Sequence, residues 1–550
     1  MSLLRKAALY IHTLRYLRLT QIWGRVVFRL SHPVPDLREA PTQREFDGSW
    51  QKPAARCPSM LGPSRFRFLN MEYELDDTDN WNSSVIPKLW IYNLHYFDDL
   101  NAVDAAKRSE WHRLQIDRWV LENPPGCGAG WEPYPISLRI VNWIKWSLAG
   151  NSLNEKTGRS LAIQARYLSS KLEWHLRGNH LLVNAKALVF AGCFFSGLEA
   201  DEWLACGMRI LEREIPEQIL PDGGHFERSP MYHALVYEDM LDLANLAAAY
   251  PVGFVSWQLS VSTWSTQIER MGRWLAVMCH PDGEIAFFND TAIGIASAPN
   301  ELFRYARQLG QVVPSLDEQV VWLKDSGYIR IERQDAVLLV DIAPLGPDYL
   351  PAHAHADTLS YELSVFGQRV IVNSGTSRYG LGPEREFERG TAAHSTLEIN
   401  GQNSSEVWGG FRVARRAYPF AVAVQENADC VTIDAAHNGY QRLHGSPVHR
   451  RRWVFGSRRL DVYDWVDGHF TTAVSRVHLH PVILLEKTGT GGRVHWGARS
   501  LRWQVDGADV AMEPLAWHPE FGVSQKSESL AMRLHEGTTQ ASSRFSLDWD

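Results

Sequence analysis

Apolar residues recur at the spacing of an α-helix between about residue 80 and residue 309, in segments that Gly, Pro and Asn separate. The expected helices span Ala105–Glu122, Ile136–Gly150, Glu155–Leu176, His180–Gly197, Glu202–Glu214, Tyr232–Tyr250, Ser260–Cys279 and Asn300–Leu309. Paired helices that short loops join at this rhythm predict an α/α toroid or solenoid.

The pattern changes beyond Ser326 to short segments in which apolar and polar residues alternate, as in β-strands with one buried face. The expected strands include Tyr328–Glu332, Ala336–Ile342, Arg369–Val372 and Ala421–Val424. Turns separate them, which is typical of an antiparallel sandwich. The pattern therefore predicts a multidomain α+β protein. An N-terminal (α/α) toroid domain over residues 81–315 is followed by an antiparallel β-sandwich domain over residues 316–550.

Residues 1–80 are expected to form an amphipathic helix followed by an irregular connector. Residues 1–30 carry six basic side chains, and the first acidic residue is Asp36. Arginines interrupt each apolar run, so a secretory signal is not predicted. Packing of this helix against its own protein is the favoured interpretation, and contact with an anionic membrane surface is the alternative.

The charge, the cysteines, the length of the apolar runs and the tryptophan count limit which kinds of protein this can be. The net charge is −7 over 550 residues and no basic domain stands out, which argues against a nucleic-acid binder. The six cysteines lie far apart without a CxxC pair, which favours free thiols in a reducing compartment. No apolar run approaches the ~18 residues of a membrane span. A cytoplasmic location is therefore expected. The 22 tryptophans are a high count, and indole rings often stack on sugars, although packing between helices explains most of them.

The segment from His353 to His394 concentrates polar chemistry. It opens with His-Ala-His-Ala-Asp (His353, His355, Asp357) and continues through an alternating stretch, Leu359–Phe366. Two histidines two positions apart on a strand point to the same side. We therefore expect a β-strand on which His353 and His355 share a metal or a substrate.

Two further clusters lie in the helical half. The first is Arg177–Asn184, in which Gly178 ends one helix and Asn179 can cap the next. Its alternative interpretation is a capping Asn beside a surface His.

The second cluster, Pro221–His233, contains Ser229-Pro230, a helix cap followed by Pro at the first helical position. Tyr232 then falls in the first turn, where the helix dipole favours negative charge. Arg228 and His225 are close enough in sequence to support a catalytic tyrosinate. The alternative is a tyrosine whose hydroxyl only satisfies a neighbouring loop.

Taken together, these clusters resemble those of the heparinase II/III-like polysaccharide lyases, relatives of the alginate and oligoalginate lyases. The stretches that carry the resemblance, in the family's order, are Gly178–His180, Asp222–His233, His353–Asp357, Ser374–Thr376 and Arg389–His394. The resemblance implies an (α/α) toroid followed by an antiparallel sandwich with the active site between them.

The resemblance also implies β-elimination on an acidic polysaccharide or oligosaccharide, without an organic cofactor. A lyase removes the C5 proton of a uronic acid and expels the C4 oxygen, so the carboxylate charge must be neutralised. Asn179 matches the neutralising asparagine, His180 and Tyr232 match the acid/base pair, and His353 matches the active-site histidine of the sheet. Which of His180 and Tyr232 is the base stays open. The residues themselves suggest Trp131, Arg139, His225, Arg228, Tyr379 and Arg389 as substrate-binding candidates. For Trp131 and Arg139, packing between toroid helices is the competing interpretation.

Members of the family can hold a structural zinc ion with two histidines and an aspartate. His355 and His394 match the histidines, but Asn373 stands at the aspartate position, and an amide is a weaker zinc ligand. Zinc is therefore an open expectation.

Two other function classes stay open. A glycoside hydrolase on the same toroid needs two carboxylates at a fixed distance, and only Glu227 and Asp357 are at hand. A non-catalytic glycan-binding protein of polysaccharide biosynthesis would not need Tyr232 and His180.

Overall fold

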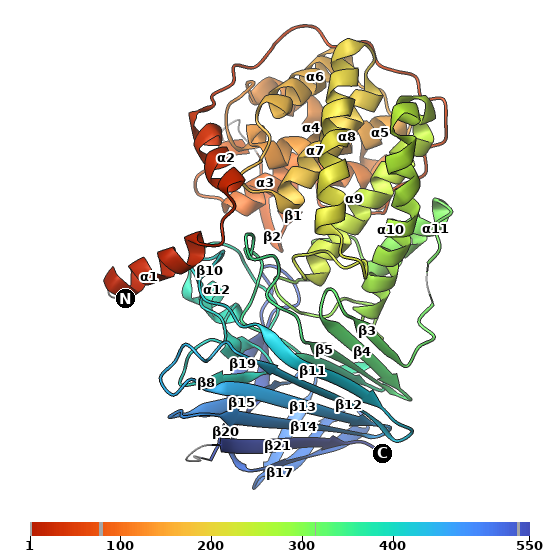
Figure 1. Cartoon of the computed structure of the whole chain (residues 1–550). Coiled ribbons are helices and arrows are strands. Elements are labelled where there is room, and N and C mark those ends of the chain that lie inside the picture. The colour runs from red at the N-terminus through yellow and green to blue at the C-terminus, as the bar shows by residue number, and fades with distance from the viewer. Residues whose placement is uncertain (1–2, 76–80, 314, 536–539) are drawn as a thin grey trace.

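The computed structural model describes residues 3–75, 81–313, 315–535 and 540–550. Helices occupy one half of the molecule and sheets the other (Figure 1). This arrangement confirms the predicted fold class.

The helical half contains all eight predicted helices, with ends that differ by a few residues. Its helices are α3 (Lys88–Tyr96), α4 (Ser109–Glu122), α5 (Pro133–Leu148), α6 (Glu155–Ser170), α7 (Gly178–Phe194), α8 (Leu198–Gln218), α9 (Pro230–Ala249), α10 (Gln258–Val277) and α11 (Pro299–Gln308). Helix α7 packs against α5, α6, α8 and α9. Every residue of α7 except His180 is buried, so this helix forms the centre of the helical core.

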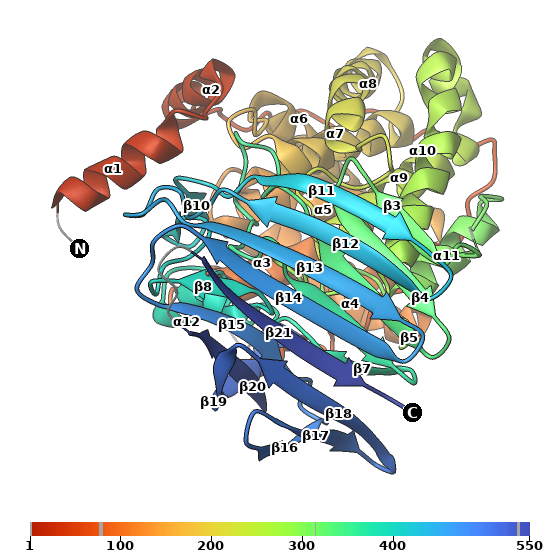
Figure 2. The same cartoon turned by 60° about the horizontal axis from the view of Figure 1, so that its bottom comes forward.

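The other half is built from antiparallel sheets. A five-stranded sheet runs in chain order through β3 (Val320–Leu323), β4 (Tyr328–Arg333), β5 (Ala336–Asp341), β6 (Tyr361–Val365) and β7 (Gln368–Ile371). An eight-stranded sheet has the order β11 (Pro419–Glu426), β12 (Cys430–His437), β13 (Val448–Gly456), β14 (Arg459–Asp467), β21 (Gln540–Asp548), β18 (Arg499–Asp506), β17 (Gly491–Trp496) and β16 (Leu484–Thr488), which Figure 2 shows face on. A four-stranded sheet joins β19 (Ala508–Trp517), β20 (Gln525–Leu534), β15 (Ala473–His478) and β8 (Leu397–Ile399). Apolar side chains from β4 to β7 pack with those of β12, β13, β14 and β21 in one core. The sandwich expected from the alternating pattern is therefore present.

Residues 3–75 differ from the single helix and connector that the sequence predicts. Two helices, α1 (Leu3–Leu14) and α2 (Leu19–Leu30), are followed by a hairpin of β1 (Arg65–Phe68) and β2 (Met71–Glu74). Figures 1 and 2 show α1 extending away from the body of the molecule. Only Leu9 of α1 and Gln21 of α2 are buried, so the expected packing involves one narrow side of each helix. Of the helices that the structure describes, none combines the length and apolarity that crossing a membrane requires.

Hydrogen bonds hold the two halves together beside the predicted clusters. The Asp222 carboxylate accepts from the backbone N–H (2.7 Å) and the hydroxyl (2.9 Å) of Ser326. The Tyr328 hydroxyl, at the start of β4, donates to the Arg228 carbonyl at 2.7 Å. The toroid and the sandwich therefore meet at the segment that contains Tyr232.

Candidate active site

His180 is the one partly open side chain of α7, and it lies in the first turn. The chain enters this helix through Arg177 and Gly178, both with positive φ (60° and 53°). The side chain of His180 is 34% exposed, and its Nδ1 lies 3.1 Å from Glu173 Oε1. Burial opposes the imidazolium, but the Glu173 carboxylate outweighs burial and raises the pKa of His180. A proton on Nδ1 leaves Nε2 available to take up or release another.

Asn179 precedes His180 in the same turn and is 6% exposed. The positive φ of Gly178 favours glycine, and a Cβ there would also meet Leu350 Cδ2 at 2.5 Å, so that side chain would have to shift. This close approach holds Asn179 and His180 next to the loop that leads to His353.

Tyr232 lies in the first turn of α9, as predicted. Ser229 caps the helix, because its hydroxyl accepts from the Tyr232 N–H at 3.2 Å, and Pro230 occupies the first helical position. The Tyr232 hydroxyl is 3.0 Å from that of Tyr379, and the Tyr232 ring lies 3.9 Å, centroid to centroid, from the His353 ring. Helix α9 and the sandwich loops therefore bring Tyr232, Tyr379 and His353 into contact.

The prediction that Arg228 and His225 support a tyrosinate is wrong. The Arg228 guanidinium donates to the carbonyls of Ser326 (2.9 Å) and Asp325 (3.3 Å), on the sandwich side. His225 is fully buried, and burial lowers its pKa well below the usual range. Burial, and then the nearby Tyr379 and Asp290, raise the pKa of Tyr232 well above 10. The resting phenol is therefore neutral and suited to donating a proton.

The predicted strand at His353-Ala-His355 is absent, since both residues lie in a loop before β6. Their side chains nevertheless meet at one group, the carboxylate of Asp290. His353 Nδ1 lies 2.9 Å from Oδ2, and His355 Nε2 lies 2.7 Å from Oδ1. The two histidines share an aspartate where the sequence predicts a shared metal or substrate.

Arg385, in the short helix α12 (Pro383–Glu388), completes this cluster. Its guanidinium donates to both oxygens of Asp290, and both side chains are fully buried. Burial opposes the Asp290 carboxylate, but Arg385 and the two histidines outweigh it and hold the pKa of Asp290 well below its usual range. Asp290 and Arg385 were not predicted from the sequence. Asp290 follows the apolar run Ile285–Phe288, a weak signal, whereas Arg385 carries none.

Glu227, which the sequence suggested only as an acid for the hydrolase alternative, also belongs to the site. Its carboxyl is 3% exposed, lies 3.8 Å from His353 Nε2, and neither oxygen accepts a well-formed hydrogen bond within the described part of the chain. Burial raises the pKa of Glu227, while His353 and His180 oppose that shift. The carboxyl therefore lies between the histidines of the two halves.

Five of the six predicted substrate-binding residues are in the interior: His225 and Arg228, described above, and Trp131, Arg139 and Arg389. Trp131 is 3% exposed and Arg139 is fully buried. The Arg139 guanidinium donates to Gln164 Oε1 (2.9 Å), to two backbone carbonyls, and stacks on Trp119. Arg389 is 1% exposed and donates twice to the Ala354 carbonyl, at 3.1 and 2.8 Å. These predictions are corrected: Trp131 and Arg139 pack between toroid helices, and Arg389 shapes the loop of His353.

Tyr379, in contrast, is only partly buried and lies at the edge of the site. Its ring is 5.3 Å from Phe411, a ring that is 39% exposed, and 5.8 Å from the His353 ring. On the toroid side, the partly exposed Tyr134 ring is 4.5 Å from that of His180. Aromatic faces therefore border the site from both halves, as sugar-binding sites often require.

The residues that match the family's zinc ligands do not fit a metal site. His355 Nδ1 is 3.2 Å from His394 Nε2, a distance that one hydrogen bond explains. Both polar atoms of the Asn373 amide are already hydrogen-bonded. Its Oδ1 accepts from the Ser395 N–H (3.0 Å), and its Nδ2 donates to the Phe287 carbonyl (3.0 Å). The described residues contain no group of three or more His, Cys, Asp or Glu positioned for a metal. A structural zinc needs four ligands, and two imidazoles fall short.

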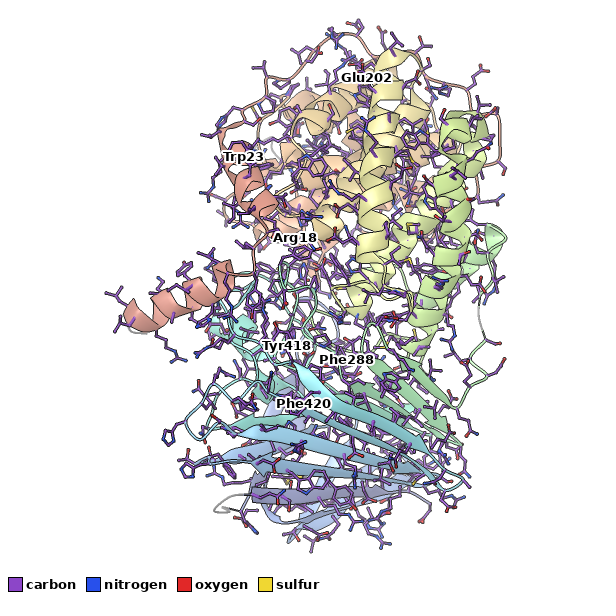
Figure 3. The ribbon with its side chains drawn as sticks, viewed as in Figure 1. Arg18, Trp23, Glu202, Phe288, Tyr418 and Phe420 are labelled. Atoms are coloured by element: carbon purple, nitrogen blue, oxygen red, sulfur yellow. The ribbon has the colours of Figure 1, made fainter. Side chains whose placement is uncertain are left out.

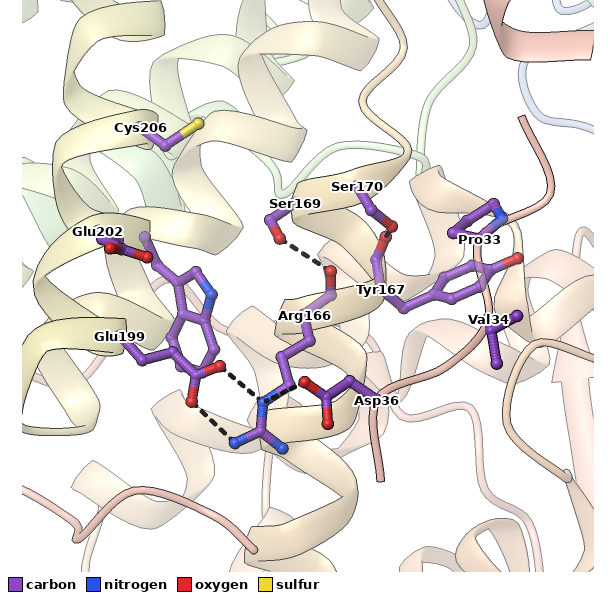
Figure 4. A pocket seen from close by; sticks show the side chains of 11 residues that line it. Pro33, Val34, Asp36, Arg166, Tyr167, Ser169, Ser170, Glu199, Glu202 and Cys206 are labelled. Atoms are coloured by element: carbon purple, nitrogen blue, oxygen red, sulfur yellow. Dashed lines mark hydrogen bonds and ion pairs between the residues drawn. The ribbon is translucent and has the colours of Figure 1, made fainter. Parts of the chain in front are cut away.

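A pocket of about 400 Å³ lies elsewhere, beside α6 and α8 (Figure 4). Arg166 in this pocket donates to both oxygens of Glu199, at 2.8 Å each, and lies 4.0 Å from Asp36. Arg166 is therefore paired with acidic residues of the same pocket, and none of the predicted catalytic residues lines it.

A helical toroid joined to an antiparallel sandwich, with polar residues at the junction, is the architecture of a class of glycan-cleaving lyases. Models of the heparinase II/III N-terminus and of the heparinase II/III-like C-terminal domain match residues 104–318 and 316–549. The chain belongs to the heparinase II/III-like family. The two matches cover both halves of the site.

Several known proteins are similar to this chain. A heparin-sulfate lyase of Pedobacter heparinus is 26% identical over 54% of this chain and 49% of its own length. The chain thus spans about half the length of that relative. FtsZ-localized protein C of Caulobacter vibrioides is 23% identical over 83% of this chain and 81% of its own length. A crystal structure of heparinase III superposes with a TM-score of 0.72, at 18% identity, over 87% of this chain and 80% of that one, which supports the fold.

Proposed function

We propose that the protein is a polysaccharide lyase that cleaves a uronic-acid-containing glycan by β-elimination and leaves a 4,5-unsaturated sugar. One observation carries the proposal. The neutral phenol of Tyr232 contacts His353 and Tyr379. Glu227, 3.8 Å from His353, is also close enough to His180 and Asn179 for both to lower its pKa against the effect of burial. Similarity to a heparin-sulfate lyase supports the substrate class, an acidic polysaccharide.

In the proposed reaction His180 is the base. Its Nε2 takes the C5 proton, and the electron pair of that C–H bond forms the C4=C5 double bond. The C4–O bond breaks, and the departing oxygen takes the phenolic proton of Tyr232. No water is consumed, and the proton on His180 returns to Tyr232 through solvent before the next cycle.

Asn179 neutralises the uronate carboxylate in this scheme by hydrogen bonding to it as charge develops at C5. The Glu173 carboxylate supports the imidazolium that forms on His180. His353, which Asp290 holds at Nδ1, orients the Tyr232 ring through the 3.9 Å contact of their centroids.

The test is incubation with a panel of uronate polymers, namely heparan sulfate, chondroitin and alginate. We expect ultraviolet absorbance from a conjugated C4=C5 uronate, and product masses that add up to the mass of the substrate. Product masses that show the addition of water would contradict the lyase proposal and favour a glycoside hydrolase.

A non-catalytic glycan-binding role is the second candidate. One observation supports it: FtsZ-localized protein C, a relative whose name is not that of a lyase, is similar over 83% of the chain, against 54% for the heparin-sulfate lyase. Tyr232→Phe separates the two candidates. A lyase loses product formation in this variant, whereas a binding protein forms no product with either residue and retains glycans equally well with both.

A further inference from the structure

We infer that α1 and α2 form a docking surface for an anionic lipid bilayer. Both helices are amphipathic, but their apolar sides face solvent. Soluble proteins normally turn such sides inward, and a contiguous exposed apolar patch indicates an interaction site. The inference is independent of the proposed catalytic function.

The outward side of α2 is a continuous apolar stripe. Leu19, Trp23 and Leu30 are 82%, 70% and 75% exposed. Ile22, Val26 and Val27 extend the stripe and are each more than 40% exposed. Figure 3 labels Trp23 on this helix at the edge of the molecule. The spacing of three and four residues places these side chains on one face.

The opposite side of α2 is attached to the toroid. Gln21 Nε2 donates to the Tyr349 carbonyl at 3.1 Å, and the Phe28 ring lies 4.2 Å from the His175 ring. A Cβ at Gly24 would lie 3.2 Å from the His175 backbone nitrogen. Because this attachment uses residues 21, 24 and 28, the apolar stripe is held facing away from the protein.

Helix α1 has the same arrangement over the sandwich. Leu3, Leu4 and Ile11 are 87%, 85% and 65% exposed, and Leu14 continues their face at 51%. Thr13, on another side, accepts from Trp408 Nε1 at 3.2 Å, and the buried Leu9 lies on that same side. Both helices are therefore fixed by one side and present the other.

The basic residues of this segment indicate that the partner of the surface formed by α1 and α2 is an anionic bilayer. The six basic residues of this segment are Arg5, Lys6, Arg15, Arg18, Arg25 and Arg29, and the first acidic residue is Asp36. Arg18 pairs with Glu217 at 2.5 Å, and its guanidinium lies 3.7 Å from the Tyr349 ring centroid. An apolar stripe in a segment whose charged residues are all basic fits the boundary between anionic headgroups and acyl chains. The same charges repel a second copy of this surface.

The test is flotation of the full chain with vesicles of equal parts phosphatidylglycerol and phosphatidylcholine, beside vesicles of phosphatidylcholine alone. We expect binding to the anionic vesicles that weakens with added salt, and little binding to the neutral ones. The double variant Trp23→Gln/Leu30→Gln removes two exposed anchors. It should bind at least ~10-fold more weakly, because each anchor loses its burial in the membrane.

The matched control is Leu121→Gln/Leu198→Gln, which changes two residues of 82% and 85% exposure outside these helices. It should float as the wild type does. Equal flotation of the two double variants, or no flotation of the wild type, would overturn the inference. Sedimentation that revealed a dimer, dissociated by Trp23→Gln/Leu30→Gln alone, would assign the surface to a second copy of the chain.

Discussion

His180 in the toroid and His355 in the sandwich both face a carboxylate, yet their protonation differs. His180 is partly exposed and has a raised pKa, and its partner Glu173 also accepts a hydrogen bond from the neutral Asn184 amide at 3.1 Å. His355 is fully buried and shares Asp290 with Arg385, and burial lowers its pKa although the aspartate opposes this. Burial therefore decides the direction at His355, where Arg385 adds to it, whereas the Glu173 carboxylate outweighs burial at His180. In the proposed reaction, the toroid side transfers the proton and the sandwich side holds His353 in place.

Asp290→Asn should have the largest effect and tests the sandwich side. The change leaves the Arg385 guanidinium buried without its anion. Removing one member of a buried pair typically costs about 3–5 kcal/mol of the free energy of unfolding. Denaturant unfolding measures it, and the double variant Asp290→Asn/Arg385→Met, which leaves no unpaired charge, should recover part of the loss. If Asp290→Asn unfolded as the wild type does, the ion pair would not organise this side.

Tyr232→Phe tests the toroid side. We expect turnover to fall at least ~100-fold, because the proposed proton donor is lost, while the melting temperature stays nearly unchanged. Tyr379→Phe is the matched control, since it removes the partner hydroxyl at 3.0 Å and keeps the Tyr232 phenol. It should cost about fivefold, the value of one hydrogen bond. Equal losses in the two variants would contradict a special role for Tyr232.

Glu173→Gln should lower the pKa of His180, because the carboxylate that raises it is gone. If His180 is the base, kcat/KM rises as that imidazole loses its proton. The acidic limb of the pH profile should therefore move to lower pH. An unmoved limb would show that the base lies elsewhere.

The His180–Glu173 pair also makes the free energy of unfolding depend on pH, and its two members do so in opposite directions. The raised pKa of His180 stabilises the wild type below pH ~6.5, and this contribution disappears as pH rises through the folded pKa. The lowered pKa of Glu173, which His180 and Asn184 cause against the effect of burial, stabilises above pH ~4.5 and is lost as pH falls. The loss of stability in Glu173→Gln should therefore be greatest between these limits, as denaturant unfolding over a pH series can measure.

The sequence predicted the elements well and the site only in part. The spacing of apolar residues reflects which face of a helix is buried. It therefore predicts the helices from α4 to α11 with ends that are correct to within a few residues. It does not encode contacts between distant residues, and Asp290 and Arg385 are 95 positions apart. Arg139 shows a second limit, because an arginine can satisfy its donors inside a helical core as readily as at a substrate.

The loop of His353 and His355 shows why local alternation misleads. Polar and apolar residues alternate there as in a strand, but the backbone bonds to side chains and to another loop. The His355 N–H donates to Asn289 Oδ1 at 3.0 Å, and the Asp290 N–H donates to the His353 carbonyl at 2.9 Å. These bonds replace a strand partner and place both histidines on Asp290.

Metal removal should have the smallest effect, and it tests the candidate zinc ligands around His355. Since Asn373 is hydrogen-bonded at both ends and His355 faces His394 directly, we expect a zinc content well below one per chain and an unchanged melting temperature after EDTA. Elemental analysis of protein purified without chelator measures the first, and calorimetry the second. Asn373→Asp sharpens the comparison, because a carboxylate restores the missing anionic ligand. Added zinc should raise the melting temperature of this variant and not that of the wild type. Stoichiometric zinc in the wild type, with a melting temperature that EDTA lowers, would mean that Asn373 gives up its backbone contacts to a metal.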